Sequence, residues 1–503
     1  MGTGRVTRKR CVYGVSLFPR TVRAAQALGE PLVTDLYCGV DFGTTNSSVA
    51  VSDGSGPVRV LQLDPHNDNP ASLPSLIYIS EDGEQIIGRA AANTFIERNV
   101  DREVLVRQVD LGIDIEGYVS SELDNDYGRS KADESTMQSE AVRAHALVEV
   151  NSPGRLFQSI KSSLKYRDFK GTQVYDRHYQ IEELVALVLV PIKVAVDREA
   201  GRPVERAVFG RPVRFSRDDR DNDLAEDRLR RAANLAGFRD VTFFYEPVAA
   251  CVEYAVATDR KQRLMVVDIG GGTCDVCIME FGGESDVARR LSESRILSVA
   301  GVPVAGDAID REIIRRKLFP SLGSRSRYGP SKLPMPMFVY KGILDWQSLY
   351  KMNTEETIHW LIAVESSSTQ PEAIRSLRTL IQRNFGYPLV RKVEHCKKML
   401  STEWEAPIEL HHHGMRIHER LGRSEFTEII EDPLADMLES IEEAERLAGV
   451  RPDQIDCVLT TGGTCLIPAV QHLLATRYSP ERLLQRETFT SVAAGLALVA
   501  QYV

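Results

Sequence analysis

Two short stretches of this 503-residue chain share one plan, and the first lies at residues 37–51. Its sequence, YCGVDFGTTNSSVAV, has β-forming residues on both sides of the tip Gly43-Thr44-Thr45-Asn46, which predicts two antiparallel strands joined by a tight turn. Such a tip can aim N–H and O–H groups at a phosphate. Asp41 ends the first strand, where a carboxylate could hold Mg²⁺ or its water shell. Taken alone, the stretch is equally typical of a surface hairpin with a polar tip.

The second stretch, at residues 264–279, favours the phosphate-binding interpretation. It reads LMVVDIGGGTCDVCIM, so an apolar strand reaches Asp268, a Gly-Gly-Gly-Thr tip follows, and the outgoing strand carries Asp275. Two aspartate-led glycine hairpins in one chain predict a duplicated architecture, in which two similar lobes grip a nucleotide between them.

Length and composition exclude several classes of protein. A chain of 503 residues is too long for one compact core and predicts roughly two to four structural units. The net charge of −9 argues against a general nucleic-acid surface. No apolar run approaches the roughly 20 residues that a membrane span needs, and the eight scattered cysteines fit a reducing cytoplasm. We therefore expect a cytoplasmic protein with no nucleic-acid partner and no membrane partner.

Two patterns suggest metal ligands, but neither forms a complete set. Cys274 and Cys277 form a C-x-x-C motif, yet positions i and i+3 of a strand face opposite sides, and no second cysteine pair is present. The histidines at 411–413 and His418 have no acidic residue or cysteine at ligand spacing. We therefore expect no transition-metal site at either place.

Further motifs occur along the chain in the order found in one known family. Residues 245–250, YEPVAA, resemble the Asn-Glu-Pro-Thr-Ala-Ala signature of the 70-kilodalton heat-shock chaperones. Residues 394–401, EHCKKMLS, resemble their adenosine-contacting helix, and residues 460–468, TTGGTCLIP, resemble their last glycine motif. The two hairpins resemble the phosphate motifs of the wider superfamily that joins actin, sugar kinases and these chaperones. The resemblance runs from about residue 37 to the end.

This resemblance implies an α/β protein with the actin-like ATPase fold, made of ribonuclease-H-like duplicated lobes. Each lobe would have a mixed sheet flanked by helices and a smaller outer subdomain. We assign lobe I to residues 37–262, with an insertion at about 95–150 that we expect to be a solvated loop; a partner-binding surface is the alternative. Lobe II is assigned to residues 263–484, with its outer subdomain at about 307–424, where residues 318–393 match no family segment.

The two ends of the chain complete this domain assignment. Residues 485–503 are predicted to form a C-terminal helix that returns to lobe I. Residues 1–36 form a basic N-terminal extension that lacks the apolar core of a secretory signal. We expect it to be disordered, because the family resemblance begins at Tyr37; a transit peptide is the alternative. The peptide-binding domain that follows the ATPase domain in the chaperones is not expected here, so the chain resembles a truncated, chaperone-like member of the family.

The resemblance also implies the residues of a nucleotide site. Glu246 would lie near the attacking water, and Asp41 and Asp268 would hold Mg²⁺ through water. With Thr273 of the second tip, these are the predicted catalytic residues. The residues predicted to contact ATP or ADP are Gly43, Thr44, Thr45, Asn46, Gly270, Gly271, Gly272, Gly306, Asp307, Glu394, Lys397, Lys398, Ser401, Gly462, Gly463 and Thr464. The four between residues 394 and 401 are predicted to share one helix face.

The sequence departs from the family pattern at a position that bears on catalysis. The segment Gly88-Arg89-Ala90-Ala91-Ala92 aligns with the family's Gly-x-x-Ala-Lys, so Ala92 stands where the chaperones carry their catalytic lysine. A lysine ammonium beside the γ-phosphate would stabilise charge that develops during phosphoryl transfer. Hydrolysis is therefore expected to be slow or absent, or to use another cation, such as Arg89 or Lys161. Leu466 likewise replaces an arginine that commonly packs on adenine.

The function predicted from the sequence is Mg²⁺–ATP binding that closes the lobes, in a chaperone-like protein of the heat-shock 70 family. Its partners would be the nucleotide and a protein partner or client that reads the closure. Three alternatives stay open. An ATP-sensing scaffold without turnover would explain Ala92. A small-molecule kinase or phosphohydrolase of the same superfamily would need an acceptor pocket, and a filament-forming actin-like protein would sediment with ATP.

Overall fold

The computed structural model describes residues 36–120, 137–258, 260–283, 286–485 and 490–503. The predicted N-terminal extension therefore lies outside the described residues except for Leu36. Within these ranges, no helix has the length and apolar character needed to cross a membrane.

The first central sheet has the strand order β13-β12-β1-β2-β3, with β4 paired to β2. Strands β1 and β2 are the antiparallel hairpin predicted at residues 37–51, and β12 and β13 continue the sheet in parallel from β1. The strands are β1 (Tyr37–Asp41), β2 (Asn46–Ser52), β3 (Arg59–Val60), β4 (Leu73–Pro74), β12 (Arg206–Arg211) and β13 (Asp240–Tyr245).

The second central sheet repeats this plan in the order β16-β15-β14-β21-β22. Strands β14 and β15 form the second predicted hairpin, β16 pairs antiparallel with β15, and β21 and β22 continue in parallel from β14. Both sheets thus have the same sequence of strand directions, with an aspartate-led hairpin at the centre. The strands are β14 (Gln262–Ile269), β15 (Cys274–Phe281), β16 (Arg295–Val302), β21 (Cys457–Thr461) and β22 (Leu483–Gln485).

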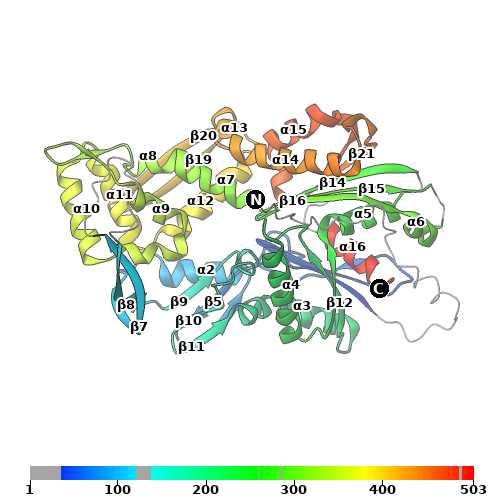
Figure 1. Cartoon of the computed structure of the whole chain (residues 1–503), viewed down its shortest axis with the longest axis horizontal. Helices are drawn as coiled ribbons and strands as arrows, with labels where there is room; N and C mark the ends of the chain where they lie inside the picture. Colours follow the sequence, from blue (N-terminus) through cyan, green and yellow to red (C-terminus); the bar gives the residue numbers. More distant parts are fainter. Residues whose placement is uncertain (1–35, 121–136, 259, 284–285, 486–489) are drawn as a thin grey trace, which may run out of the picture.

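Two helices, α5 (Glu246–Val256) and α16 (Ser491–Val499), lie between the two sheets (Figure 1). Their apolar residues form one buried cluster with β12 of the first sheet and with β14, β15 and β21 of the second. Successive side chains of a strand face opposite sides, so Leu264 and Val266 of β14 join this cluster while Met265 and Val267 face away. The two sheets are therefore held to each other through α5 and α16.

Further helices cover the outer face of each sheet. Helices α3 (Ile181–Ala200) and α4 (Asp219–Ala236) share a buried cluster with β1, β2 and β12. Helix α4 ends at Ala236 and is followed by Gly237, whose positive φ of 104° provides a left-handed C-cap. On the second sheet, α14 (Glu431–Ala448) and α15 (Pro468–Tyr478) contribute to the largest cluster.

Close backbone contacts fix α16 in place. A Cβ atom on Gly39 of β1 would collide with the backbone at Ala497, and one on Gly495 would collide with the carbonyl oxygen of Ala249 in α5. Only glycine permits such approaches. Helix α16 therefore sets the position of α5, and Glu246 is the first residue of α5.

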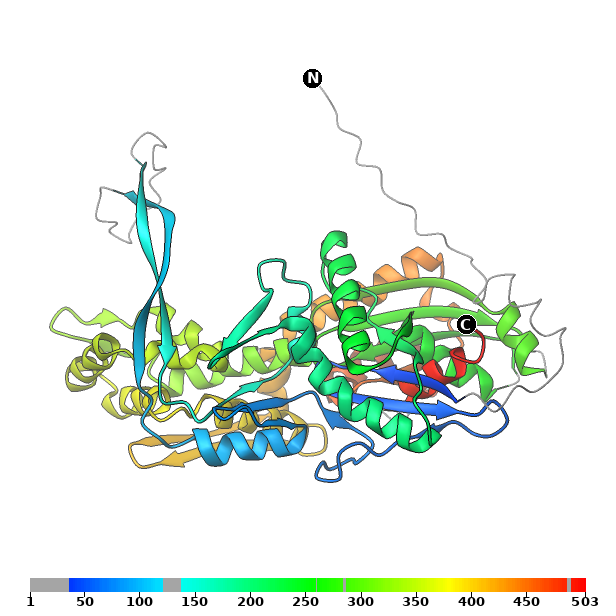
Figure 2. The same cartoon turned by 90° about the horizontal axis from the view of Figure 1, so that it is seen from below.

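The smaller part attached to the first sheet contains a three-stranded sheet, β6-β5-β9, and helix α2 (Arg89–Asn99). The expectation of a loop at residues 95–150 is wrong, since α2 continues to Asn99 and two long antiparallel strands follow, β7 (Val106–Ser120) and β8 (Met137–Glu149). Figure 2 shows this hairpin projecting from the body of the molecule. Strands β5, β6 and β9 span Ile77–Ser80, Gln85–Ile87 and Gly154–Phe157.

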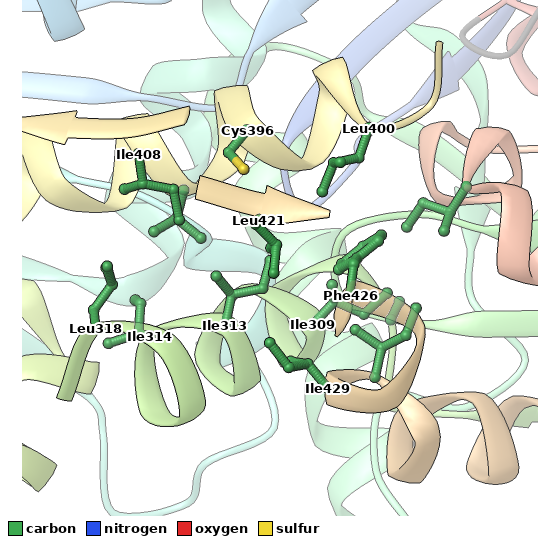
Figure 3. Close-up of a cluster of buried hydrophobic side chains, with 14 of the residues drawn as sticks. Ile309, Ile313, Ile314, Leu318, Cys396, Leu400, Ile408, Leu421, Phe426 and Ile429 are labelled. Carbon is green, nitrogen blue, oxygen red and sulfur yellow. The ribbon is translucent and has the colours of Figure 1, made fainter. Parts of the chain in front are cut away.

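The corresponding part of the second half, which includes residues 318–393, is mainly helical. Its helices are α9 (Met337–Lys341), α10 (Glu355–Ser367), α11 (Pro371–Gln382) and α12 (Gly386–Met399), followed by the hairpin β19 (Glu405–His412) and β20 (Met415–Gly422) and helix α13 (Arg423–Ile429). Figure 3 shows how apolar side chains of α7 (Gly306–Ile313) pack against α12, this hairpin and α13. This core positions α7 and α12, which carry predicted site residues.

The two smaller parts meet through three aromatic side chains, which we call the aromatic clasp: Phe95 of α2, Trp346 and Tyr387. The ring of Phe95 lies edge-on to Trp346 and Tyr387, with centroids 5.6 and 5.5 Å apart. The rings of Trp346 and Tyr387 are 4.8 Å apart. Hydrogen bonds from Asn384 to the carbonyl of Asn99, at 3.0 Å, and from Asn353 to that of Val104 join the same two parts.

Candidate functional site

The two glycine tips face each other, as the duplicated pattern predicts. A Cβ atom on Gly271 would collide with the hydroxyl of Thr45, and a Cβ atom on Gly272 would lie 2.8 Å from the hydroxyl of Thr44. The tips of β1–β2 and β14–β15 are therefore in direct contact in this conformation. Residues more than 220 positions apart in the sequence meet here.

Each tip is supported by hydrogen bonds from neighbouring segments. The hydroxyl of Ser75 donates to the carbonyl of Gly43 at 2.9 Å. In the second tip, the carbonyl of Gly270 accepts from the hydroxyl of Thr464 at 2.8 Å and from the amide of Gly306 at 3.2 Å. The amide of Asp307 donates to the carbonyl of Gly271 at 2.8 Å. The amide of Gly306 thus stabilises the tip in this conformation and is not directed at a ligand.

Four carboxylates from both halves gather beneath the tips. Asp41 ends β1, Asp268 lies in β14, Asp275 lies in β15, and Glu246 begins α5. Asp268 and Asp275 are directly opposite each other in the antiparallel register, so their side chains share one face of the hairpin. Asp275 accepts the amide of Val213 at 2.7 Å. Asp41, Asp268 and Glu246 were predicted from the sequence, and Asp275 is an additional member.

Burial and mutual repulsion raise the pKa of three of these carboxyl groups, Asp41, Asp268 and Asp275. Burial, reinforced by the charge of Glu246, raises the pKa of Asp41 to about 7 and that of Asp275 to about 7. The same causes, with the charges of Asp275 and Asp41 added, raise the pKa of Asp268 well above its ordinary value. The hydroxyl of Thr273 bonds to Asp275 and acts in the opposite direction. The cluster therefore carries more buried negative charge than its surroundings neutralise.

Lys161 is the cation inside this cluster. It lies on a short 3₁₀ helix, η2 (Ile160–Ser163), and its Nζ is 2.7 Å from Oε1 of Glu246. Both side chains are buried, with 6% and 9% of their side-chain surface exposed. Burial alone would lower the pKa of Lys161, and the charges of Glu246 and Asp41 raise it above its usual value. Lys161 therefore remains an ammonium group.

The helix that resembles an adenosine-contacting element lies on the second-half side of the tips. Nζ of Lys397 in α12 is 2.8 Å from Oδ2 of Asp310 and 3.2 Å from the carbonyl oxygen of Gly306, which places it beside the second tip. Glu394 pairs with Lys398 at 3.0 Å. Ser401 follows the end of α12 at Met399, so the expectation that it continues the same helix face is wrong.

The last glycine motif also borders the tip. Gly462 has a φ of +84°, and a Cβ atom there would lie 2.9 Å from Oδ1 of Asp268. Gly463 begins the 3₁₀ turn that carries Thr464 onto the second tip. This backbone thus passes directly beside a predicted Mg²⁺ carboxylate, which a residue with a side chain would prevent.

One further set of side chains has metal-ligand spacing. The ligand atoms of Glu409, His411 and His418 lie within 4.8 Å of one another on β19 and β20. The sequence argument that no acidic residue accompanies these histidines is therefore wrong. His411 and His418 are exposed, His418 pairs with Glu409 at 3.1 Å, and Arg416 lies directly opposite His411. We interpret this set as a close contact between polar side chains on a surface hairpin.

The assembled site can be matched to a metal and a phosphate chain. Mg²⁺ prefers carboxylate oxygens and water as ligands. Half-buried Asp41 and Asp268 and buried Asp275 supply carboxylates whose mutual repulsion a divalent cation would relieve. Where the two tips meet, the groups that they present are the glycine backbone of one tip and the threonine hydroxyls of the other. The residues present therefore fit Mg²⁺ and a polyphosphate.

Comparison with known proteins identifies the class to which this arrangement belongs. Residues 155–288 and 381–502 match the family model described as Hsp70 protein. Because these segments make up more than half of the chain, the chain belongs to the Hsp70 protein family.

Two relatives illustrate the relationship. The chain is similar to "Chaperone protein dnaK3" of Thermosynechococcus vestitus, with 24% identity over 466 residues, which covers 92% of this chain and 54% of that protein. It is similar to "Chaperone protein DnaK 1" of a Synechococcus species, with 23% identity over 464 residues, covering 92% of this chain and 49% of that protein. The chain spans about half the length of the curated relatives it matches.

Proposed function

We propose that this chain has the actin-like ATPase fold and binds ATP with Mg²⁺ between its two halves, so that the nucleotide controls their closure. The observation that carries the proposal is the meeting of two glycine tips above carboxylates drawn from both sheets. The same strand directions in both sheets support the predicted pair of lobes, at residues 37–262 and 263–484. The close packing of α16 on Gly39 of β1 supports the predicted return of residues 485–503 to lobe I.

The roles of individual side chains follow from their positions. Asp41 and Asp268 would hold Mg²⁺ through water, and Asp275 would add charge from the opposite strand. Residues 43–46 and 270–273 would contact the phosphates from opposite sides, and Lys397, Gly463 and Thr464 would border the second tip on the nucleoside side. Mg²⁺ would offset the negative charge that the phosphates bring into this carboxylate-rich site.

Closure is the mechanical output that this arrangement supports. Besides the core around α5 and α16, the halves are in contact at the glycine tips and at the aromatic clasp. A ligand that contacts both tips binds more tightly to the closed arrangement of the halves than to the open one. The ratio of its two affinities sets how far the equilibrium shifts from open to closed. A chaperone-like role, in which a protein partner or client senses the closure, is our preferred interpretation. The relatives named chaperones support it.

The proposal is tested by nucleotide binding to a variant of the carboxylate cluster. Asp268→Ala should weaken Mg²⁺-dependent binding of a fluorescent ATP analogue by at least tenfold, measured by anisotropy, because a metal-facing charge is lost. Asp453→Ala is the matched control, since that carboxylate is 66% exposed and pairs with Arg451 at the surface. Equal affinity of both variants and the unmodified chain would remove the assignment.

A further inference from the structure

The contact between the two smaller parts continues beyond the aromatic clasp. Helix α2 packs through buried Ala92 and Phe95 into the apolar cluster that contains the clasp. Just after α2 ends, the amide of Asp101 donates to the carbonyl of Arg383 in the second half at 2.9 Å. Main-chain atoms of the two halves are therefore hydrogen-bonded to each other at this point.

The loops that meet here each turn at a residue with a left-handed backbone. Asp101, in the first half, has a φ of 61°, and Asn384, in the second, has a φ of 56°. Aspartate and asparagine adopt this conformation more readily than other residues that carry a Cβ atom. The residue types on both sides therefore suit the turns that bring the two loops together.

The side chain of Asp101 also crosses to the second half. Its Oδ1 lies 2.7 Å from Nε2 of His412 at the end of β19. The ring of His412 is edge-on to that of Phe385, with centroids 4.9 Å apart. Because 19% of the side-chain surface of His412 and 53% of that of Asp101 are exposed, protons from the solvent reach the pair.

The elements of the second half that pack around the hairpin of His412 contribute uncharged side chains. Helix α12 packs on β19 through apolar side chains that include Leu389 and Val393. Helix α11 contacts β20 through the hydroxyl of Thr379, and Met415 is opposite His412 in the register of the hairpin. The charged partner of the ring therefore comes from the first half.

The charged side chains next to this contact in the sequence are directed elsewhere. Arg102 forms an ion pair with Glu149. Arg383 and the two histidines that flank His412 have exposed side chains. In the described part of the chain, Asp101 is thus the charged group that the ring of His412 contacts.

A contact between a histidine and a carboxylate responds to pH. Histidine is the side chain whose charge ordinarily changes between pH 5 and pH 8. A protonated ring and a carboxylate form a charge-assisted hydrogen bond, which is roughly twice as strong as a bond between neutral groups. Because His412 and Asp101 belong to different halves, the protonated ring gains this bond only when the halves are closed. Proton binding and closure therefore favour each other, and closure is more stable at pH 6 than at pH 8.

We propose that His412 and Asp101 form a proton-sensitive latch, which holds the two halves closed at mildly acidic pH and weakens as the pH rises. The latch lies outside the glycine tips and the carboxylate cluster, so it would change the rate at which the halves open without contacting the nucleotide. Its effect on the release of ADP rests on the proposed nucleotide binding.

The test is stopped-flow release of a fluorescent ADP analogue, chased with excess ATP, at pH 6 and at pH 8. At pH 6, Asp101→Asn should release the analogue roughly two- to fivefold faster than the unmodified chain, the range expected for a partly exposed ion pair. At pH 8 the difference should fall below about twofold. Asparagine also suits the left-handed turn, so the variant removes the charge and keeps the backbone. His412→Gln keeps a neutral donor and should behave in the same way.

Two more variants isolate the pair. Asp101→Asn combined with His412→Gln should be no faster at pH 6 than either single variant, because both remove the same interaction. His411→Gln is the matched control, since His411 is exposed and its side chain lies on the other face of β19 from His412. It should match the unmodified chain at both pH values. Comparing the chains at each pH cancels the titration of the carboxylate cluster, which all of them share.

Equal acceleration at pH 6 and pH 8, no acceleration at pH 6, or additive effects of the two substitutions would overturn the latch. Failure of the unmodified chain to bind ADP would refute the proposed function instead. The latch is then read from urea unfolding of the nucleotide-free chain. The same four chains should show coupling between Asp101 and His412 at pH 6 that weakens at pH 8, and the absence of coupling at pH 6 would overturn the inference.

Discussion

The aromatic clasp should control how fast nucleotide leaves the closed arrangement. Phe95→Leu keeps most of the apolar volume but removes two edge-on ring contacts across the halves, with Trp346 and Tyr387. Each such pair contributes about 0.5–1.5 kcal/mol beyond burial, so the closed arrangement should lose about 1–3 kcal/mol. The contact of Phe95 with Tyr78, at 6.4 Å, lies within one half and is present whether the halves are open or closed.

A loss of this size corresponds to a roughly 5- to 150-fold faster release of ADP. The assay is stopped-flow release of a fluorescent ADP analogue, chased with excess ATP. Phe243→Leu is the matched control, because its ring partner Phe209, at 6.3 Å, lies in the same half. It should lower the free energy of unfolding and leave release unchanged. Release from the Phe95→Leu chain at the rate of the control would refute the role of the clasp.

Three other substitutions test separate parts of the structure. Asp275→Asn should raise the melting temperature of the metal-free chain at pH 8 and change it little at pH 4.5. The pKa of Asp275 rises from 3.8 to about 7 on folding, so the free energy of unfolding of the unmodified chain falls as pH increases between these values. A change in melting temperature that does not depend on pH would contradict this reasoning. Gly495→Ala should lower the free energy of unfolding in urea by about 1–3 kcal/mol, because α16 must move away from Ala249; an unchanged unfolding midpoint would show that the packing adapts. Ala92→Lys should lower the melting temperature and leave ATP hydrolysis no faster; faster hydrolysis would show that α2 can still serve the site.

The two hairpins and their carboxylates could be predicted because the pattern that defines them is local. An apolar strand, an aspartate and a glycine tip occupy fewer than twenty consecutive residues at each place. Asp275 could also have been found, since a four-residue tip places it opposite Asp268. Its place on the outgoing strand was predicted from the sequence, but no role in the site was assigned to it.

Lys161 could be named as a candidate but not placed by sequence reasoning. Its contact with Glu246 joins residues 85 positions apart, and no local periodicity encodes such a pairing. The hairpin β7–β8 was missed for a different reason. Residues 107–110 are exposed, so this part of β7 has no buried face and needs no alternation of apolar and polar residues, which is the main sequence signal for a strand.

The central claim is that the two glycine tips and the carboxylates beneath them hold one nucleotide through Mg²⁺. Isothermal titration calorimetry of the unmodified chain with ATP, in Mg²⁺ and in excess EDTA, tests it without any substitution. We expect one site per chain in Mg²⁺ and at least tenfold weaker binding in EDTA. No heat in Mg²⁺, or the same affinity with and without the metal, would contradict the account.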